Sequence, residues 1–314
     1  MISIRSASKR FPGATSDAVH RLSFDVDEGE VVVLVGPSGC GKTTTVRMIN
    51  RLIEPTSGTI VVDGIDVSRR DPVELRRSIG YVIQTVGLLP HRTVAQNIAT
   101  VPDLLGWEPS RTARRVDELA ALFELDPELL PRYPGELSGG QRQRVGVARA
   151  LAADPPVMVM DEPFAAVDPI VRGRLQDQFL DIQRRLQKTI VMVTHDIDEA
   201  IKMADRIAIL NVGGVLEQYA RPEVILRAPA NAFVAGFVGG ERGLRRLGLI
   251  AVRDIELEDG PRPDGAPQVR DDCMLREALD VLVTDGSAVV AVVGEDGGYL
   301  GALTLERISL ELGP

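Results

Sequence analysis

Three short runs of apolar residues punctuate the first two thirds of the chain, at 30–35, 157–160 and 189–193. A run with almost no polar position is typical of a strand that is buried on both faces, as in a parallel sheet. Between these runs, apolar residues recur at three- and four-residue spacing over 43–52, 111–122, 140–152 and 171–186, which predicts helices. The alternation of the two patterns predicts an α/β domain.

The pattern changes after about Phe237, where Gly239 and Gly240 precede an arginine-rich stretch. We therefore predict two units, residues 1–238 and 239–314. Residues 255–267 are rich in Pro, Gly and acidic residues, which predicts a loop or linker. The tail that follows predicts a helix, a strand, a turn and a second strand, over 275–282, 288–293, 295–298 and 299–303.

Composition and charge narrow the class of protein. The longest apolar runs are far shorter than the roughly 20 residues that cross a bilayer, and the N-terminus lacks the pattern of a secretory signal, so we expect a cytoplasmic protein. The formal net charge is −9, and residues 241–314, with eight Arg and fifteen Asp or Glu, carry −7 of it. We expect no nucleic-acid partner, because such proteins usually have a basic face. Two distant cysteines, Cys40 and Cys273, support neither a disulfide framework nor a thiolate metal site.

The segment Gly36-Pro-Ser-Gly-Cys-Gly-Lys-Thr43 lies between the first apolar run and the first predicted helix. It fits the phosphate-binding loop pattern in the strand and helix context that this pattern requires. Its glycines let successive N–H groups point at phosphate oxygens, and the helix N-terminus adds a partial positive charge. We expect Lys42 on the outer phosphates and the Thr43 hydroxyl on magnesium. The alternative is a Gly-rich turn without a ligand, which the flanking elements disfavour.

Two carboxylates, Asp161 and Glu162, end the second apolar run, and His195 follows the third. Ligands bind at the carboxyl ends of the strands in open α/β sheets. Because neighbouring side chains of a strand point in opposite directions, we assign Asp161 to the magnesium and Glu162 to the attacking water as general base. A neutral imidazole at His195 can hydrogen-bond a terminal phosphate or orient water. The alternatives are a solvated strand end and a structural histidine.

The segment Leu137-Ser-Gly-Gly-Gln-Arg-Gln143 resembles the signature motif of the ATP-binding-cassette (ABC) ATPases, and its spacing to Asp161 resembles theirs. The resemblance covers residues 1 to about 238. It implies an α/β P-loop NTPase fold of the ABC type, with a helical subdomain over about 85–155. One stretch, Ala165-Ala-Val-Asp168, departs from the Ser-Ala-Leu-Asp that is commonest in the family, which concerns the detail of contacts between subunits.

The resemblance implies roles for further residues. Phe11 matches the aromatic side chain that stacks on adenine, Gln84 the glutamine that links ATP to the membrane partner, Asp168 the loop that crosses between subunits, and His195 the switch histidine. The implied ATP contacts are Phe11, Gly36, Pro37, Ser38, Gly39, Cys40, Gly41, Lys42, Thr43, Thr44, Gln84, Ser138, Gly139, Gly140, Gln141, Asp161, Asp168 and His195. The implied catalytic residues are Glu162, His195, Lys42 and Gln84, and the implied magnesium ligands are Thr43, Gln84 and Asp161.

The signature motif also implies a second copy of the chain. In the family, Ser138, Gly139 and Gly140 of one subunit close over the ATP that the phosphate loop of the other subunit holds, and helix N-terminal amides face the nucleotide. We therefore expect a homodimer that closes on ATP and opens after hydrolysis.

Within the family, the stretches 84–93, 97–102, 160–164, 167–169 and 194–201 resemble ATPases of bacterial uptake systems for osmoprotectants and other quaternary amines. This implies import of glycine betaine, choline, carnitine or proline through a separate permease, served by an extracytoplasmic substrate-binding protein. The chain is then expected at the cytoplasmic side of the membrane, with residues 86–93 facing the permease. The alternatives are a soluble ABC ATPase that is not coupled to transport and an exporter subunit. The chain has neither the coiled-coil insertions or second cassette of the former nor the fused membrane domain of the latter.

The tail resembles one regulatory motif of the cystathionine-β-synthase (CBS) type, over 275–279, 289–293 and 300–304. This implies a small C-terminal α+β regulatory domain that pairs across the dimer and senses an adenine nucleotide or ionic strength. An inert capping module is the alternative. Arg242, Arg245 and Arg246 form a basic cluster at its start, and we hypothesise an autoinhibition that salt relieves.

Overall fold

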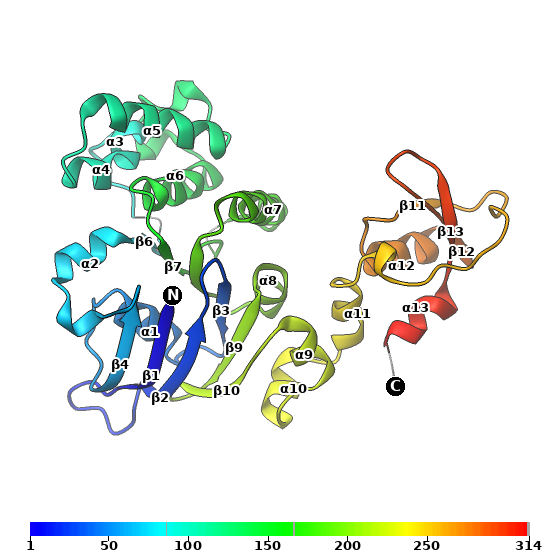
Figure 1. Cartoon of the computed structure of the whole chain (residues 1–314), viewed down its shortest axis with the longest axis horizontal. Coiled ribbons are helices and arrows are strands. Elements are labelled where there is room, and N and C mark those ends of the chain that lie inside the picture. Colours follow the sequence, from blue (N-terminus) through cyan, green and yellow to red (C-terminus); the bar gives the residue numbers. More distant parts are fainter. Residues whose placement is uncertain (86, 166, 313–314) are drawn as a thin grey trace. The chain divides into compact units, whose positions relative to one another are not determined.

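The computed structural model describes residues 1–85, 87–165 and 167–312. Val86 and Ala166, which belong to two of the predicted stretches, lie outside the described residues. The chain divides into two compact units, Met1–Pro222 and Glu223–Pro314 (Figure 1). Within the described residues, no helix is both long and apolar enough to span a bilayer.

A largely parallel sheet forms the centre of the first unit, in the order β10-β9-β3-β8-β7-β6. The predicted apolar strands are β3 (Val31–Val35), β7 (Val157–Asp161) and β8 (Thr189–Val193). They are neighbours with parallel pairing, and all of their residues are buried, which explains the lack of polar positions. The flanking strands are β6 (Ile79–Val82), β9 (Arg206–Asn211) and β10 (Val215–Ala220), and β10 runs antiparallel to β9. The predicted parallel sheet is confirmed.

An antiparallel sheet in the order β2-β1-β4-β5 stands beside it. Its strands are β1 (Ile2–Lys9), β2 (Val19–Val26), β4 (Ser57–Val62) and β5 (Ile65–Asp66). One hydrophobic cluster joins the two sheets through helix α1 (Lys42–Ile49), because Ile4 and Phe24 of this sheet share it with Val46 of α1 and Val191 of β8. This shared core holds the start of α1 at the carboxyl ends of β3 and β7.

Helices complete the first unit, and several of them form a separate helical subdomain (Figure 1). The subdomain contains α3 (Val94–Ile98), α4 (Thr100–Leu104), α5 (Pro109–Leu122), η2 (Pro127–Leu129), η3 (Pro134–Glu136) and α6 (Gly139–Leu151). The other helices are η1 (Val67–Arg69), α2 (Pro72–Ser78), α7 (Pro169–Leu186) and α8 (Ile197–Met203). The four helices predicted from periodicity are present as α1, α5, α6 and α7.

The loop that leads from the sheet into the helical subdomain is held by one buried side chain, Asn97 of α3. Its Oδ1 accepts a hydrogen bond from the Leu89 N–H at 2.7 Å, and its Nδ2 donates to the carbonyl oxygens of Leu89, Arg92 and Thr93. A buried amide that satisfies several backbone groups holds a loop in one conformation. Asn97 therefore holds residues 89–93 in place.

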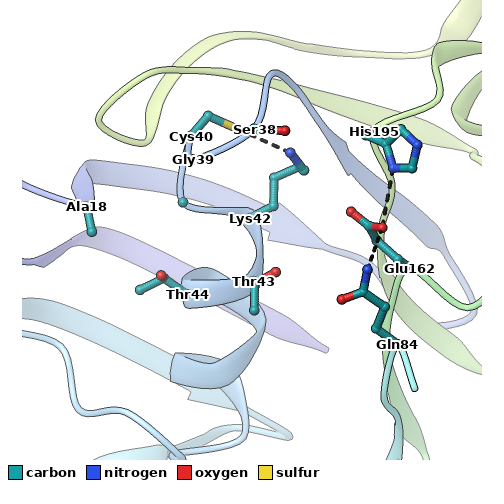
Figure 2. Close-up of a pocket in the computed structure, with 11 residues that line it drawn as sticks. Ala18, Ser38, Gly39, Cys40, Lys42, Thr43, Thr44, Gln84, Glu162 and His195 are labelled. Carbon is teal, nitrogen blue, oxygen red and sulfur yellow. Dashed lines mark hydrogen bonds and ion pairs between the residues drawn. The ribbon is translucent and has the colours of Figure 1, made fainter. Parts of the chain in front are cut away.

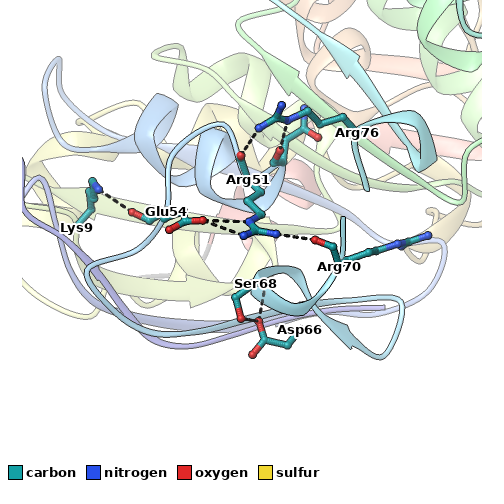
Figure 3. Close-up of polar contacts among 8 residues, drawn as sticks. Lys9, Arg51, Glu54, Asp66, Ser68, Arg70 and Arg76 are labelled. Carbon is teal, nitrogen blue, oxygen red and sulfur yellow. Dashed lines mark hydrogen bonds and ion pairs between the residues drawn. The ribbon is translucent and has the colours of Figure 1, made fainter. Parts of the chain in front are cut away.

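Arginine side chains close the carboxyl end of α1 (Figure 3). The Arg76 Nη2 of α2 donates to the Arg51 carbonyl oxygen at 2.6 Å, and the Arg51 guanidinium donates to the Arg70 carbonyl oxygen and to Glu54. The Lys9 Nζ of β1 donates to the Glu54 carbonyl oxygen at 2.7 Å. Cations at a helix C-terminus satisfy orphan carbonyls and the helix dipole. These contacts link α1 to both α2 and the antiparallel sheet.

The second unit is built on a small sheet in the order β11-β12-β13. The predicted helix, strand, turn and strand are α12 (Leu275–Asp285), β12 (Val289–Val293), a turn at Gly297 and β13 (Tyr299–Thr304). The elements that were not predicted are α9 (Pro222–Arg227), α10 (Ala232–Val238), α11 (Arg242–Leu247), η4 (Val252–Asp254), β11 (Gln268–Arg270) and α13 (Leu305–Leu312). The predicted loop at 255–267 is attached to the sheet, because Glu258 and Ala302 exchange two backbone hydrogen bonds.

The division of the chain at residue 222 precedes the boundary predicted at 238, which falls within the second unit. The residues between these positions form α9 and α10, after the last strand of the central sheet. The buried cluster around the small sheet begins later, at Leu247 of α11. Helical periodicity shows which residues of a helix are buried but not against which core they are buried. The predicted boundary therefore differs from this division of the chain by one pair of helices.

Candidate functional site

The glycine-rich loop follows β3 and leads into α1, as predicted. Two of its glycines have no room for a side chain. A Cβ at Gly36 would lie 2.1 Å from the Leu210 carbonyl oxygen, and one at Gly41, where φ is +93°, would lie 2.3 Å from the Ala18 carbonyl oxygen. Both positions require glycine, because backbone oxygens cannot withdraw from such contacts. The loop is therefore shaped by close packing against β9 and the residue before β2.

The Lys42 side chain is buried and folds back over this loop. Its Nζ donates to the carbonyl oxygens of Gly36 at 2.7 Å and Pro37 at 3.1 Å, and it lies 3.6 Å from the Cys40 Sγ. A single ammonium thus lies at the centre of the loop, and the first N–H groups of α1 have no partner within the helix. This combination of donors suits a chain of phosphates.

Thr43 and Asp161 meet across the site, from the start of α1 and the end of β7. The Thr43 Oγ1 donates to the Asp161 Oδ1 at 3.0 Å. Burial raises the pKa of Asp161, while the hydrogen bond from Thr43 and the charges of Arg47 and Lys42 oppose that rise. A hydroxyl beside a carboxylate is an oxygen donor set of the kind that Mg²⁺ takes together with nucleotide phosphates.

Glu162 differs from the expected extension of β7. The strand ends at Asp161, and Glu162 has φ +48°, in the left-handed region, while its N–H donates to the Val193 carbonyl oxygen of β8 at 2.9 Å. The direction of its side chain is therefore set by this turn and not by the alternation of a strand. Left-handed backbone is costly for a residue with a side chain and often marks a functional position.

Gln84 and His195 converge on Glu162 (Figure 2). The Gln84 Nε2 donates to the Glu162 Oε2 at 3.0 Å, and the His195 Nδ1 lies 3.3 Å from the same oxygen. The His195 side chain is 61% exposed and that of Glu162 19% exposed. A carboxylate with one oxygen engaged and a histidine beside it can accept a proton from water.

Most of these groups line one pocket of about 490 Å³, although Gly36, Pro37 and Asp161 are not among its lining residues. Its lining residues are Ala18, Ser38, Gly39, Cys40, Gly41, Lys42, Thr43, Thr44, Gln84, Glu162 and His195. The volume is typical of small-molecule sites. Lys42 and the loop lie on one side of it, and Gln84, Glu162 and His195 lie on the other (Figure 2). Residues that the sequence placed far apart therefore share one cavity.

Other predicted contacts lie outside the lining of this pocket, as far as the described part of the chain shows. Phe11 is 40% exposed, and the Lys9 Nζ lies 5.4 Å from its ring centre. Asp168 is exposed just before α7. Ser138 is the N-cap of α6, where it and Gln141 exchange two hydrogen bonds in a capping box. Ser138 is exposed, Gly139, Gly140 and Gln141 are half-buried, and none of them lines the pocket formed by the loop of its own chain.

The comparison with known proteins decides the family. A family profile described as ABC transporter matches residues 19–165. The chain is 56% identical over 309 residues to the glycine betaine/carnitine/choline transport ATP-binding protein OpuCA of Bacillus subtilis (strain 168), which covers 98% of this chain and 79% of that protein. It is 46% identical over 312 residues to the glycine betaine uptake system ATP-binding protein YehX of Escherichia coli (strain K12), which covers 99% of this chain and 100% of that protein. The chain belongs to the ATPase subunits of ABC transporters.

Solved ABC cassettes share the fold of this ABC ATPase. One is described as the dimeric structure of a post-hydrolysis state of the ATP-binding cassette MJ0796 bound to ADP and Pi. It is 31% identical, with a TM-score of 0.64, and the match covers 71% of this chain and 99% of that chain. The predicted fold class, an ABC-type P-loop NTPase domain, is confirmed.

Two features of the ABC ATPase site were missed from the sequence. Ala18 lines the pocket and limits residue 41, but nothing about a small residue before a strand marks it for this position. Glu199 is buried behind the loop that carries His195. It occurs in one of the stretches that resemble the family, but an acidic residue near a helix N-terminus is usually a solvated one.

Proposed function

We propose that this ABC ATPase hydrolyses ATP to power the import of osmoprotectants, either quaternary amines such as glycine betaine, choline and carnitine or the amino acid proline, through a separate permease. The observation that carries the proposal is the similarity over nearly the whole chain to transport ATP-binding proteins that are named for glycine betaine, carnitine and choline. Its transported solute does not contact this chain, because a permease and an extracytoplasmic binding protein select it.

In this proposal, Lys42 and the N–H groups of residues 38–44 bind the phosphates of ATP. Thr43, Asp161 and Gln84 hold a magnesium ion, which neutralises phosphate charge when bound. Among the described residues, no cluster of three or more His, Cys, Asp or Glu side chains could hold a metal. The magnesium site is therefore completed by the nucleotide, as the donor pair Thr43 and Asp161 suggests.

Glu162 is the proposed general base. It accepts the proton of the water that attacks the terminal phosphate, and His195 and Gln84 hold its carboxylate and the water in position. Their contacts to one Glu162 oxygen support this assignment, since the other oxygen is left for the water. Phe11 is proposed to stack on the adenine ring.

We propose that two copies of the chain form the working unit. The N-cap Ser138 is exposed, and the first residues of α6 are half-buried, so the N–H groups at this helix N-terminus suit a phosphate that another subunit holds. Asp168, which is also exposed, is proposed to cross to that subunit. The dimer in the similar solved structure supports this arrangement.

The permease is proposed to dock at a groove of about 230 Å³ in the first unit, at the cytoplasmic side of the membrane. Its walls include Tyr81 of β6, Leu89 of the 86–93 stretch, Val101 of α4 and Arg149 of α6. The Arg149 Nη1 donates to the Gly87 carbonyl oxygen at 2.7 Å, which joins this wall to the stretch after Gln84. A partner that binds in this groove contacts the stretch after Gln84, and Gln84 in turn donates a hydrogen bond to Glu162.

Residues 239–314 are proposed to form a regulatory module of the CBS type. Two of the three arginines in its basic cluster are already engaged, because Arg245 donates to the Val238 carbonyl oxygen and Arg246 to that of Leu312. We keep the hypothesis that this module inhibits transport and that salt relieves the inhibition. If deletion of residues 241–314 leaves the salt response of uptake unchanged, the hypothesis is wrong.

Uptake assays test the proposed function. A panel of radiolabelled quaternary amines and proline is supplied to cells that lack the chain and to cells that regain it, with a Glu162→Gln chain as the inactive control. We expect uptake of at least one osmoprotectant with the native chain and none with the control. Native ATPase activity without any such uptake, and without a copurifying permease, would instead support a soluble ABC ATPase.

A further inference from the structure

A buried carboxylate lies next to the turn that carries His195. Glu199, in the first turn of α8, is 7% exposed, and its two oxygens accept hydrogen bonds from two different elements. Oε2 accepts from the Thr194 hydroxyl at the end of β8, and Oε1 accepts from the Gln176 Nε2 of α7 at 3.1 Å. Thr194 and Gln176 are 2% and 6% exposed. The three side chains thus form a chain of buried hydrogen bonds across β8, α8 and α7.

These buried hydrogen bonds fix the backbone on both sides of His195. The Thr194 N–H donates to the Leu34 carbonyl oxygen at 3.1 Å, and its hydroxyl oxygen accepts from the Asp196 N–H at 3.1 Å. Such a hydroxyl-centred turn bends the chain around the residue between its ends. Because the Thr194 hydroxyl donates its hydrogen bond to Glu199, the lone pairs of the hydroxyl oxygen can accept from the Asp196 N–H. Glu199 therefore orients the group that bends the His195 turn.

The imidazole itself has little other support. Its side chain is 61% exposed, and it approaches Glu162 at 3.3 Å. An exposed ring on a turn goes where the turn directs it, and a displacement of about 1 Å at a reacting group can cost about 100-fold in rate. The position of His195 relative to Glu162 therefore depends on the buried hydrogen bonds at Glu199.

The other end of this series of hydrogen bonds, at Gln176, leads toward Asp168. Gln176 belongs to α7, which begins at Pro169, directly after Asp168. The Arg172 N–H of α7 donates to the Asp168 carbonyl oxygen at 2.8 Å, so the start of this helix and the Asp168 backbone are bonded together. A shift of α7 is thereby passed to Glu199 and from there to the His195 turn.

Packing alone does not account for a carboxyl group at this position. Burial raises the pKa of Glu199, while the hydrogen bonds from Thr194 and Gln176 oppose the rise. An apolar side chain avoids this desolvation cost, and a buried polar group is favourable only where its hydrogen bonds are made. What an apolar side chain lacks is the pair of acceptors that joins Thr194 to Gln176.

We propose that Glu199 is a positioning residue for ATP hydrolysis, which holds the His195 turn against Glu162 and couples it to the helix that follows Asp168. This inference rests on the proposed roles of Glu162 and His195. It adds a residue that touches neither ATP nor water.

The test is a donor and acceptor exchange in the full-length chain. Glu199→Gln removes the charge and leaves one acceptor oxygen for the two donors Thr194 and Gln176, and we expect kcat for ATP hydrolysis to fall about tenfold, the effect of losing one buried hydrogen bond to a charged group. The KM for ATP should stay within about twofold, because the phosphate loop is untouched. Adding Gln176→Glu restores an acceptor opposite the new amide, so the double variant should recover kcat to within about threefold of the native value.

Two controls separate positioning from general support of the fold. Lys202→Met removes the other link between α8 and α7, where the Lys202 Nζ lies 2.7 Å from the Asp177 Oδ1 and 3.3 Å from the Gly173 carbonyl oxygen without touching Thr194. We expect it to leave kcat within about twofold, since exposed ion pairs contribute little. In a His195→Ala background, Glu199→Gln should lower kcat no further, because it acts through His195.

The outcomes distinguish the inference from the function on which it rests. If Glu199→Gln lowers the melting temperature but leaves kcat unchanged, or if Lys202→Met lowers kcat equally, Glu199 is only structural and the inference is overturned. If His195→Ala and Glu162→Gln themselves leave turnover intact, the proposed hydrolytic site fails, whatever Glu199 does. A kcat loss that the exchange repairs and that vanishes without His195 supports positioning.

Discussion

On the phosphate-loop side of the pocket, Lys42 and Asp161 are buried and bonded to their neighbours, whereas on the opposite side Gln84 and His195 are exposed and meet at a single oxygen of Glu162. The first side is shaped by backbone packing, which leaves no room for a side chain at Gly36 or Gly41. The second side depends on a few hydrogen bonds from separate loops. Under the proposed function, the first side therefore binds the phosphates of ATP, and the second side controls hydrolysis.

The largest expected effect is on turnover from the exposed side. Glu162→Gln removes the base while keeping the shape of the side chain, so we expect kcat to fall by about 100- to 10,000-fold. ATP binding should persist, because Lys42 and its loop are unchanged, and the bound dimer should accumulate in size-exclusion chromatography. Near-native turnover would remove Glu162 from the role of base.

A smaller effect, on affinity, is expected from the buried side. Lys42→Ala leaves the loop without its cation, and we expect the Kd for ATP to rise about 100-fold, or about 3 kcal/mol, in calorimetric titration. Lys188→Ala is the matched control. The Lys188 Nζ pairs with the Asp154 Oδ1 at a distance of 2.8 Å, and neither residue lines the pocket. Equal losses in the two variants would contradict a special role for Lys42.

The rigidity of the loop can be tested through stability. Gly41→Ala forces a Cβ to within 2.3 Å of a carbonyl oxygen, and we expect a loss of about 1 to 3 kcal/mol in urea unfolding. Gly39→Ala has a similar backbone strain at φ +79° but no atom within 4 Å of its Cβ, so it should lose only about 1 kcal/mol. If the two variants are equally stable, close packing does not shape the loop.

The smallest expected effect is a pH dependence of the stability, which arises from Glu199, the buried residue next to the His195 turn. The raised pKa of Glu199 means that the folded chain holds this proton more tightly than the unfolded chain does. The stability that the group contributes is thus present below its ordinary pKa and is lost as the pH rises through the raised value. Asp196 adds to the rise and Arg172 opposes it.

The glutamine at this position in Glu199→Gln does not titrate. We therefore expect the melting temperature of the variant, relative to that of the native chain, to rise as the pH increases above the ordinary pKa of a glutamate and through the raised pKa of Glu199. A constant difference across this range would show that Glu199 does not lose a proton on unfolding. The measurement is independent of activity.

Much of the first unit could be predicted from the sequence, because its signals are local or repeat at known intervals. The runs that became β3, β7 and β8 are apolar on both faces, as central parallel strands must be. Their carboxyl ends meet at one edge of the sheet, so Thr43 and Asp161 could be expected together. The antiparallel sheet was missed, since strands such as β2 are half exposed and interrupted by irregular register.

Other features of the site follow from contacts that no local pattern encodes. Glu162 leaves its strand in a left-handed conformation, and its N–H donates to a carbonyl oxygen of β8. The direction of its side chain was predicted from strand alternation, but this turn sets it instead. The Gln84 contact joins residues 78 positions apart. Burial of Glu199 depends on α7 and β8 together, and an isolated α8 would expose it.

The amino-acid sequence by itself determined the fold class, the ABC family and the phosphate loop, because strand burial, helix periodicity and glycine requirements are properties of short segments. Only the tertiary structure decided how Gln84 and His195 meet at Glu162, how Glu199 joins α7 to the His195 turn, and where the chain divides into units. These depend on distances between elements that are remote along the chain, and such distances are set by the packing of the whole core.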